Sequence, residues 1–123
     1  MKFLSAANSS PLISICIPLY ETEVFLADCL RSVMLQDFDS FEVVIVSDDS
    51  RGRDQKGRNA KKIVTVCEKE CNKERKSHGL LPVQVRFIEH HENRGLIEVR
   101  RTLCYEARGL YMTQVDSDDQ MEE

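Results

Sequence analysis

The sequence predicts a three-layer α/β/α domain built on a mostly parallel sheet. Four short runs rich in apolar and β-branched residues alternate with three segments whose apolar residues recur at helical spacing, and turn residues separate several of them. Strands and helices that alternate in this way form parallel sheets with right-handed crossovers and helices on both faces. We therefore expect the order βαβαβαβ without an internal repeat.

The first strand is expected at residues 12–17, a compact apolar run that Pro18 stops. A helix over residues 23–36 should follow, with Thr22 as its N-cap. Its apolar side chains recur along one face of the helix, which predicts a single buried stripe. The stripe comprises Leu26, Leu30, Val33 and Met34.

The second strand, residues 41–46, is almost entirely β-branched or aromatic and contains one charge. That composition is typical of a strand covered by helices on both faces. The strand runs directly into four polar residues, 47–50. Residues 51–62 are rich in Arg, Lys, Gly and Asn without apolar periodicity, so we expect an exposed loop there.

The second helix carries Cys67 and Cys71 on its apolar stripe, flanked by many charged residues. This pattern predicts a surface helix with a solvated charged face rather than a basic binding patch. Gly79 and Pro82 mark its end. Residues 83–88 alternate apolar with polar side chains, which predicts a third strand nearer an edge of the sheet.

A third helical stripe leads to the last strand. Gly109 is expected to close this helix, and residues 110–115 should form a fourth strand that delivers the chain to Asp116. The stripe comprises Leu96, Val99, Leu103 and Ala107.

The 123-residue chain is the size of one domain, with a polar leader over residues 1–11 and the domain over residues 12–123. A net charge of -4 gives no reason to expect nucleic acid or an anionic membrane as partner. No segment approaches the roughly 18 consecutive apolar residues of a membrane span. The five cysteines lack C-x-x-C spacing, which favours reduced core thiols in a cytoplasmic protein.

Polar residues follow three of the predicted strands. Tyr20 follows the first strand, Asp48 and Asp49 the second, and residues 116–119 the fourth. Ligands of open parallel sheets bind outside the carboxyl ends of the strands. Five carboxylates gathered there would repel one another unless hydrogen-bond donors or a divalent cation joined them. A solvated acidic turn is the alternative interpretation of residues 116–119.

The chain resembles family 2 glycosyltransferases in several ordered segments. Residues 13–20 resemble the family's opening strand, which typically ends in Pro-x-Tyr-Asn, and residues 30–36 look like its first helix. Residues 41–50 are similar to its second strand with the following Asp-Asp-Gly/Ser. Residues 93–111 contain signals like its Asn-x-Gly-Leu, Arg and Gly-x-Tyr, and residues 116–119 stand where the family carries Asp-x-Asp.

This resemblance implies a Rossmann-like GT-A fold, present here as the truncated half that binds the nucleotide-sugar donor. The full-length protein would transfer a sugar, with inversion, from a nucleoside diphosphate donor, expected to be a UDP-sugar, to a saccharide or lipid-linked acceptor in polysaccharide biosynthesis. Mn²⁺ or Mg²⁺ would be the cofactor. The general base is expected beyond Glu123, so this chain alone should be inactive.

For the base of the donor, the resemblance implies contacts from Tyr20, through its ring face, and from Asp49, as acceptor of a base N–H. Asp48 would support this pocket, and Pro18 and Glu21 would lie beside it. Glu21 departs from the family, which usually carries Asn at that position.

For the diphosphate, the resemblance implies that Asp118, aided by Asp116, binds the metal. Ser117 lies between them and would also contact the donor. Arg94 or Arg100 would reach the donor or hold the acidic loops together.

Simpler interpretations of these residues stay open. Tyr20 could be a partly buried turn aromatic, the two aspartates after the second strand could cap the next segment, and Arg100 could form an ordinary surface ion pair. His90 and His91 follow a strand without a metal-ligand pattern, which favours a solvated loop.

Two other functions remain possible from the sequence. One is a non-catalytic nucleotide-sugar-binding or interaction protein, which the missing general base would favour if Glu123 is the natural terminus. The other is a receiver-like Mg²⁺-binding signalling domain, although its acids should follow the first and third strands. The domain could also self-associate through an exposed sheet edge or apolar surface.

Overall fold

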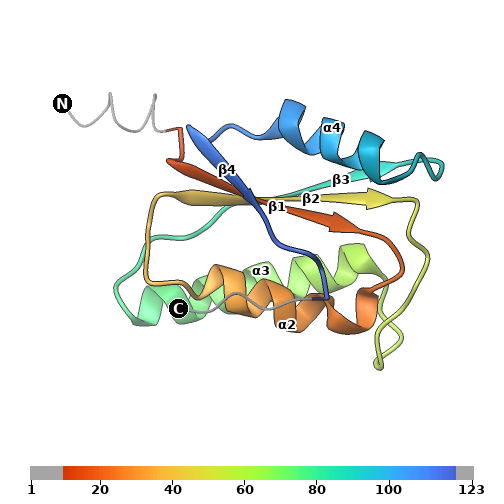
Figure 1. Ribbon diagram of the computed structural model, residues 1–123. Helices are drawn as coiled ribbons and strands as arrows, with labels where there is room; N and C mark the ends of the chain where they lie inside the picture. Colours follow the sequence, from red (N-terminus) through yellow and green to blue (C-terminus); the bar gives the residue numbers. More distant parts are fainter. Residues whose placement is uncertain (1–9, 119–123) are drawn as a thin grey trace.

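The computed structural model describes residues 10–118. These residues form a parallel four-stranded sheet in the order β3-β2-β1-β4. Helices α2 and α3 cover one face of the sheet and α4 covers the other (Figure 1), so the predicted α/β/α layers and the order βαβαβαβ are confirmed. In chain order the elements are β1 (Ile13–Leu19), α2 (Glu23–Met34), β2 (Phe41–Asp48), α3 (Ala60–Ser77), β3 (Val85–His90), α4 (Leu96–Glu106) and β4 (Tyr111–Gln114).

Strand β2 lies inside the sheet and is buried along its whole length. Val43 and Ile45 pack into the large core beneath α2 and α3, whereas Val44 and Val46 pack with residues of α4. Successive side chains of a strand point to opposite faces, so this alternation explains why almost every position is apolar. The same alternation places Glu42 and Asp48, near the two ends of β2, on the α4 face.

Several element boundaries differ from the prediction. Helix α2 ends at Met34 rather than at residue 36, and Thr22 makes no side-chain cap. At the next helix, α3, the N-cap is Asn59, whose side chain accepts a 2.9 Å hydrogen bond from the Lys62 N–H. Strand β3 does lie at an edge of the sheet, as expected, and β4 forms the opposite edge with all of its residues exposed.

Arg75 on α3 is an exception to the predicted solvated charged face, because its side chain is completely buried. It lies four residues beyond Cys71 on the same helical stripe, over the ring of Phe41 at 5.3 Å. Its guanidinium joins the loops that precede β2 and β3. It donates to the carbonyls of Met34, Gln36, Phe38 and Leu81 at 2.7–2.9 Å and to the Asp39 carboxylate at 3.1 Å.

The cysteine prediction holds at four positions and fails at one: Cys104 is exposed on α4, whereas Cys16, Cys29, Cys67 and Cys71 are buried. Burial raises the pKa of Cys16 and of Cys71 to about 11, so both thiols stay protonated at neutral pH. Within the described residues, no helix combines the length and apolar character needed to cross a membrane.

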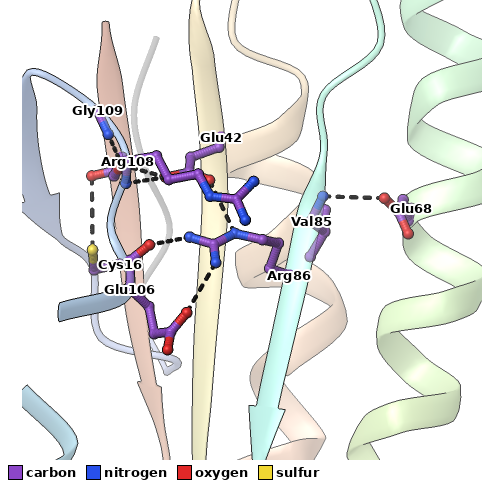
Figure 2. A network of polar contacts seen from close by, with 9 residues as sticks. Cys16, Glu42, Glu68, Val85, Arg86, Glu106, Arg108 and Gly109 are labelled. Atoms are coloured by element: carbon purple, nitrogen blue, oxygen red, sulfur yellow. Dashed lines mark hydrogen bonds and ion pairs between the residues drawn. The ribbon is translucent and has the colours of Figure 1, made fainter. Parts of the chain in front are cut away.

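A cluster of polar side chains joins the starts of β1, β2 and β3 to the segment before β4 (Figure 2). Glu42 is its centre: it accepts from the Ser14 hydroxyl at 2.6 Å, from the Arg108 N–H at 2.8 Å and from Arg86 Nε at 3.2 Å. Arg86 also pairs with Glu106 at 3.1 Å. Burial alone would raise the pKa of Glu42, but these donors outweigh it and hold the pKa below its ordinary value.

Candidate functional site

A cavity of about 460 Å³ lies at the carboxyl ends of the strands, where an open parallel sheet is expected to bind ligands. It gathers residues that are far apart in the chain. Its lining comprises Pro18, Leu19, Tyr20, Thr22, Asp48, Asn93, Gly95, Leu96, Val99, Asp116, Ser117 and Asp118.

The structure brings only part of the predicted site to this cavity. Glu21, Asp49, Arg94 and Arg100 are not among its lining residues. Asp119 and Glu123, also singled out in the sequence, lie outside the described residues. The predicted residues that do line the cavity are Pro18, Tyr20, Asp48, Asp116, Ser117 and Asp118.

Tyr20 and Asp48 form one side of the cavity. Tyr20 is half exposed and lines the cavity. Asp48 is buried, and its Oδ1 accepts from the Arg94 N–H at 2.8 Å while its Oδ2 accepts from the Gly95 N–H at 2.9 Å. Burial opposes ionisation of Asp48, but these N–H groups and the His90 ring outweigh it and lower the pKa, so the carboxylate is charged at neutral pH.

His90 is buried next to Asp48, contrary to the prediction from the sequence. The expectation of a solvated loop is wrong for His90, which ends β3 and is buried, whereas His91 is exposed. The Nδ1 atom of His90 lies 3.1 Å from Asp48 Oδ1 and its Nε2 atom lies 2.8 Å from Thr102 Oγ1. His90 is the register partner of Asp48 in the sheet. Ile88, two residues earlier in β3, packs against the core beneath α4. Because alternate residues of a strand share a face, this spacing could have predicted that His90 points to the same side.

The loops after β1 and β2 are joined to each other beside the cavity. Glu21 and Asp49 both adopt positive φ, at 54° and 56°. The Glu21 carboxylate accepts from the Arg51 N–H at 2.7 Å, and its own N–H donates to the Ser50 hydroxyl at 2.7 Å. Asp49 pairs with the Arg51 guanidinium at 3.1 Å. In this arrangement Glu21 joins the two loops, whereas Asp49 pairs within its own loop, and neither residue lines the cavity.

The acidic segment after β4 forms the other side of the cavity. Asp116 and Asp118 are exposed and flank the buried Ser117, whose hydroxyl contacts that of Thr22. Cys29 donates its thiol to the Asp116 carbonyl at 3.6 Å, which further ties the segment to α2. Both carboxylates therefore project from a segment that is held at its centre.

These two carboxylates suit a hard divalent cation that takes its remaining ligands from a phosphate or from water. No group of three or more His, Cys, Asp or Glu residues suited to a metal occurs within residues 10–118. A cation here would therefore need non-protein oxygens, or ligands outside that range.

Arg94 and Arg100 are exposed, at the loop before α4 and on α4 itself. Over residues 10–118 neither guanidinium forms an ion pair, so the simple surface pair considered for Arg100 is not seen in that part of the chain. Their suggested contact with the donor stays a prediction.

A family model described as Glycosyl transferase family 2 matches residues 14–123. The uncharacterized glycosyltransferase EpsJ of Bacillus subtilis is 30% identical over 109 residues, which are 89% of this chain and 26% of EpsJ. Glycosyltransferase GlyA of Streptococcus pneumoniae is 32% identical over 111 residues, 90% of this chain and 13% of GlyA. The chain thus spans about a quarter or less of these relatives.

Solved structures show the same fold. The structure of S. aureus TarS 1-349 in complex with UDP has a TM-score of 0.65 and 25% identity, over 88% of this chain and 28% of that one. The mannosyltransferase PcManGT of Pyrobaculum calidifontis, in complex with GDP-Man and Mn²⁺, has a TM-score of 0.70 and 19% identity, over 92% of this chain and 29% of that one. The GT-A fold suggested by the sequence is therefore confirmed.

Proposed function

Because the chain belongs to glycosyl transferase family 2, we propose that it binds the nucleoside diphosphate sugar donor of a glycosyl transfer, together with Mn²⁺ or Mg²⁺. The observation that carries the proposal is the shared cavity, which has an exposed aromatic ring on one side and two exposed carboxylates on the other. UDP is the expected nucleotide, supported by the TarS complex with UDP.

In this proposal each side of the cavity has one task. The Tyr20 ring stacks on the base, and Asp48 supports that side by holding the Arg94–Gly95 backbone. Asp116 and Asp118 would hold the cation. When bound, it would supply positive charge that stabilises the departing nucleoside diphosphate. Pro18 and Ser117 complete the walls.

The base contact proposed for Asp49 requires an exchange of partners. Its carboxylate now pairs with Arg51 at 3.1 Å, and the Arg51 side chain is largely exposed. Exposed ion pairs contribute only about 0–1 kcal/mol, so a base N–H could displace Arg51 at little cost. We propose that Asp49 turns to the base when the donor binds, while Glu21 keeps the loop in place.

For the whole protein, we propose inverting transfer. An acceptor hydroxyl attacks the anomeric carbon, the bond from that carbon to the diphosphate oxygen breaks, and a carboxylate base removes the hydroxyl proton. We place this base in the part of the full-length protein that corresponds to the unmatched length of the relatives. Arg94 or Arg100 is proposed to meet the diphosphate.

Calorimetric titration with UDP in the presence of Mn²⁺ tests the donor site. The wild-type chain should bind, EDTA should abolish most of the binding, and Asp118→Ala should weaken it by about tenfold or more, since a charged ligand to the metal is lost. Asp37→Ala removes an exposed carboxylate at the amino ends of the strands and should change nothing. No binding at millimolar UDP would reject the proposal.

The alternatives have different support. Family membership and the position of the acids, after β2 and β4, leave the receiver-like signalling domain without an observation in its favour. A non-catalytic nucleotide-sugar-binding protein would share the cavity chemistry. Sugar release from UDP-sugar by the full-length protein, with and without saccharide acceptors, separates binding from transfer.

A further inference from the structure

We propose that His90 is a positioning residue for the donor site: it fixes the Asp48 carboxylate, and through Asp48 the Arg94–Gly95 backbone that shapes the cavity. This inference rests on the proposed function, because it assigns His90 an effect on donor affinity. His90 does not line the cavity itself. Its influence has to pass through Asp48, which does.

The His90 ring bridges three elements of the fold. It lies at the end of β3, with its side chain only 6% exposed, between Asp48 on β2 and Thr102 on α4. The Asp48 carboxylate is ionised and can only accept, so His90 Nδ1 donates in the 3.1 Å contact. Thr102 is itself held, since its hydroxyl also lies 3.0 Å from the Glu98 carbonyl. The ring therefore has a fixed orientation.

The Asp48 carboxylate passes this order on to the loop before α4. Oδ1 accepts both from His90 Nδ1 and from the Arg94 N–H, and Oδ2 accepts from the Gly95 N–H. Gly95 has φ of 90°, a conformation in which side chains are strained and which here brings its N–H to the carboxylate. Asn93, Gly95 and Leu96 are then placed as one wall of the cavity.

Charge makes this positioning matter for an anionic ligand. Asp48 is a buried negative charge that borders the cavity in which the donor diphosphate is proposed to bind. While three donors engage it, its charge is compensated and its oxygens face the loop. Loss of His90 leaves Oδ1 with one donor and lets the carboxylate turn toward the cavity, where it would repel phosphate and release the loop.

Two amide substitutions separate the Asp48 contact from the rest of the ring. The amide nitrogen of asparagine can take the place of Nδ1, so His90→Asn keeps the donor to Asp48. The longer glutamine places its amide nitrogen near the former Nε2, so His90→Gln keeps the Thr102 contact and loses the one to Asp48. His90→Leu loses both. His91→Gln changes the exposed neighbour and is the matched control.

The test measures UDP affinity with Mn²⁺, and amide hydrogen exchange at Arg94 and Gly95 without nucleotide. His90→Gln and His90→Leu should bind UDP about tenfold more weakly, the scale of one lost hydrogen bond to a charged group. Their Arg94 and Gly95 amides should exchange faster. His90→Asn should stay within about threefold of wild type in both measurements, and His91→Gln should be unchanged.

Two different failures can be told apart. A wild-type chain that does not bind UDP rejects the proposed function, and the assignment of His90 to the donor site with it. Wild-type binding that His90→Gln and His90→Leu leave intact rejects the His90 inference alone. If His90→Leu does not fold, the amide pair decides: equal losses in His90→Asn and His90→Gln would mean that ring packing, and not the Asp48 contact, is what matters.

Discussion

Strand β2 carries a buried carboxylate near each end, and the two ends use it differently. Glu42 and Asp48 are 3% and 4% exposed, and donors hold both pKa values below their ordinary range against the effect of burial. Around Glu42 the donors form a network that joins the starts of β1, β2 and β3 to the segment before β4 (Figure 2). Around Asp48 they hold a loop that borders a cavity. One arrangement stabilises the fold, and the other shapes a site.

Cavity size does not distinguish the two ends. A second cavity, of about 500 Å³, lies at the amino ends of the strands and is lined by Asp39, Glu42 and Arg108 among others. Both oxygens of Glu42 are engaged there, and Asp39 pairs with Arg75. At the carboxyl end, by contrast, Asp118 is exposed and makes no hydrogen bond or ion pair over residues 10–118, while Asp116 accepts from the Gln114 amide at 3.2 Å. The two cavities therefore differ in how their carboxylates are engaged, and not in volume.

The largest effect is expected from Arg75→Ala, at the amino ends of the strands. It would leave four carbonyls that now accept from the guanidinium without that donor, so we expect a loss of about 4 kcal/mol in the free energy of unfolding. Urea denaturation measures it. UDP affinity of the protein that remains folded should be unchanged. Lys76→Ala, at the exposed neighbouring position, should cost no more than about 0.5 kcal/mol.

Glu42→Ala should cost about 3 kcal/mol, because it leaves the largely buried Arg86 guanidinium, whose side chain is 14% exposed, without its inner partner. Glu106→Ala removes only the outer, more exposed partner of Arg86 and should cost about 1 kcal/mol or less. Thermal or urea unfolding separates the two variants. If Glu42→Ala kept full stability yet lost UDP binding, the assignment of this end to structure would be wrong.

Two glycines compare the ends more finely. A Cβ on Gly109 would lie 2.6 Å from the Ser14 backbone nitrogen, whereas one on Gly95 would meet no atom within 4 Å but would be strained at φ of 90°. Each alanine substitution should cost about 1–2 kcal/mol. Only Gly95→Ala should also weaken UDP binding, since it disturbs the wall of the donor cavity. Equal UDP affinity in both variants would contradict the division between the ends.

The smallest effect is a dependence on pH. The folded-state pKa of Glu42 lies below its ordinary value of 4.5, so its contribution to stability is present above that value and is lost as pH falls through the folded pKa. The folded-state pKa of Asp48 likewise lies below its ordinary value of 3.8, so its contribution is also lost as the pH falls through the folded pKa. The urea concentration at the midpoint of unfolding should therefore decrease as the pH is lowered below about 4.5. This decrease should be less steep in Glu42→Gln. An unchanged slope in that variant would contradict the assignment.

The layers of the fold and the position of the site follow from patterns along the chain. Periodicity predicts the alternating elements, and the carboxyl ends of parallel strands meet at one edge, so Tyr20, Asp48 and residues 116–118 could be expected together. The relation of these residues to a donor came from the family resemblance, which the family match supports.

The burial of Arg75 and of His90 was not predicted, because it depends on the partners of each side chain. A charged or polar group is stable inside only if enough donors or acceptors surround it, and those come from distant segments. For Arg75 they are carbonyls of two loops, and for His90 they are Asp48 and Thr102. The polar residues next to Arg75 and His90 in the sequence indicated solvent exposure. The position of Arg75 on the buried stripe of α3, and the pairing of His90 with Asp48 in the sheet, were better indicators of burial.

The most direct test of the central claim is the paramagnetic effect of Mn²⁺ on amide signals in the presence of UDP. Glu42 and Asp48 lie about 20 Å apart along β2, far enough for the two ends to respond differently. Mn²⁺ with UDP should broaden the signals of Asp48, Gly95 and Ser117 and leave those of Glu42 and Arg86 sharp. Broadening at the amino ends of the strands, or none at the cavity, would contradict a donor and metal site between Tyr20 and Asp118.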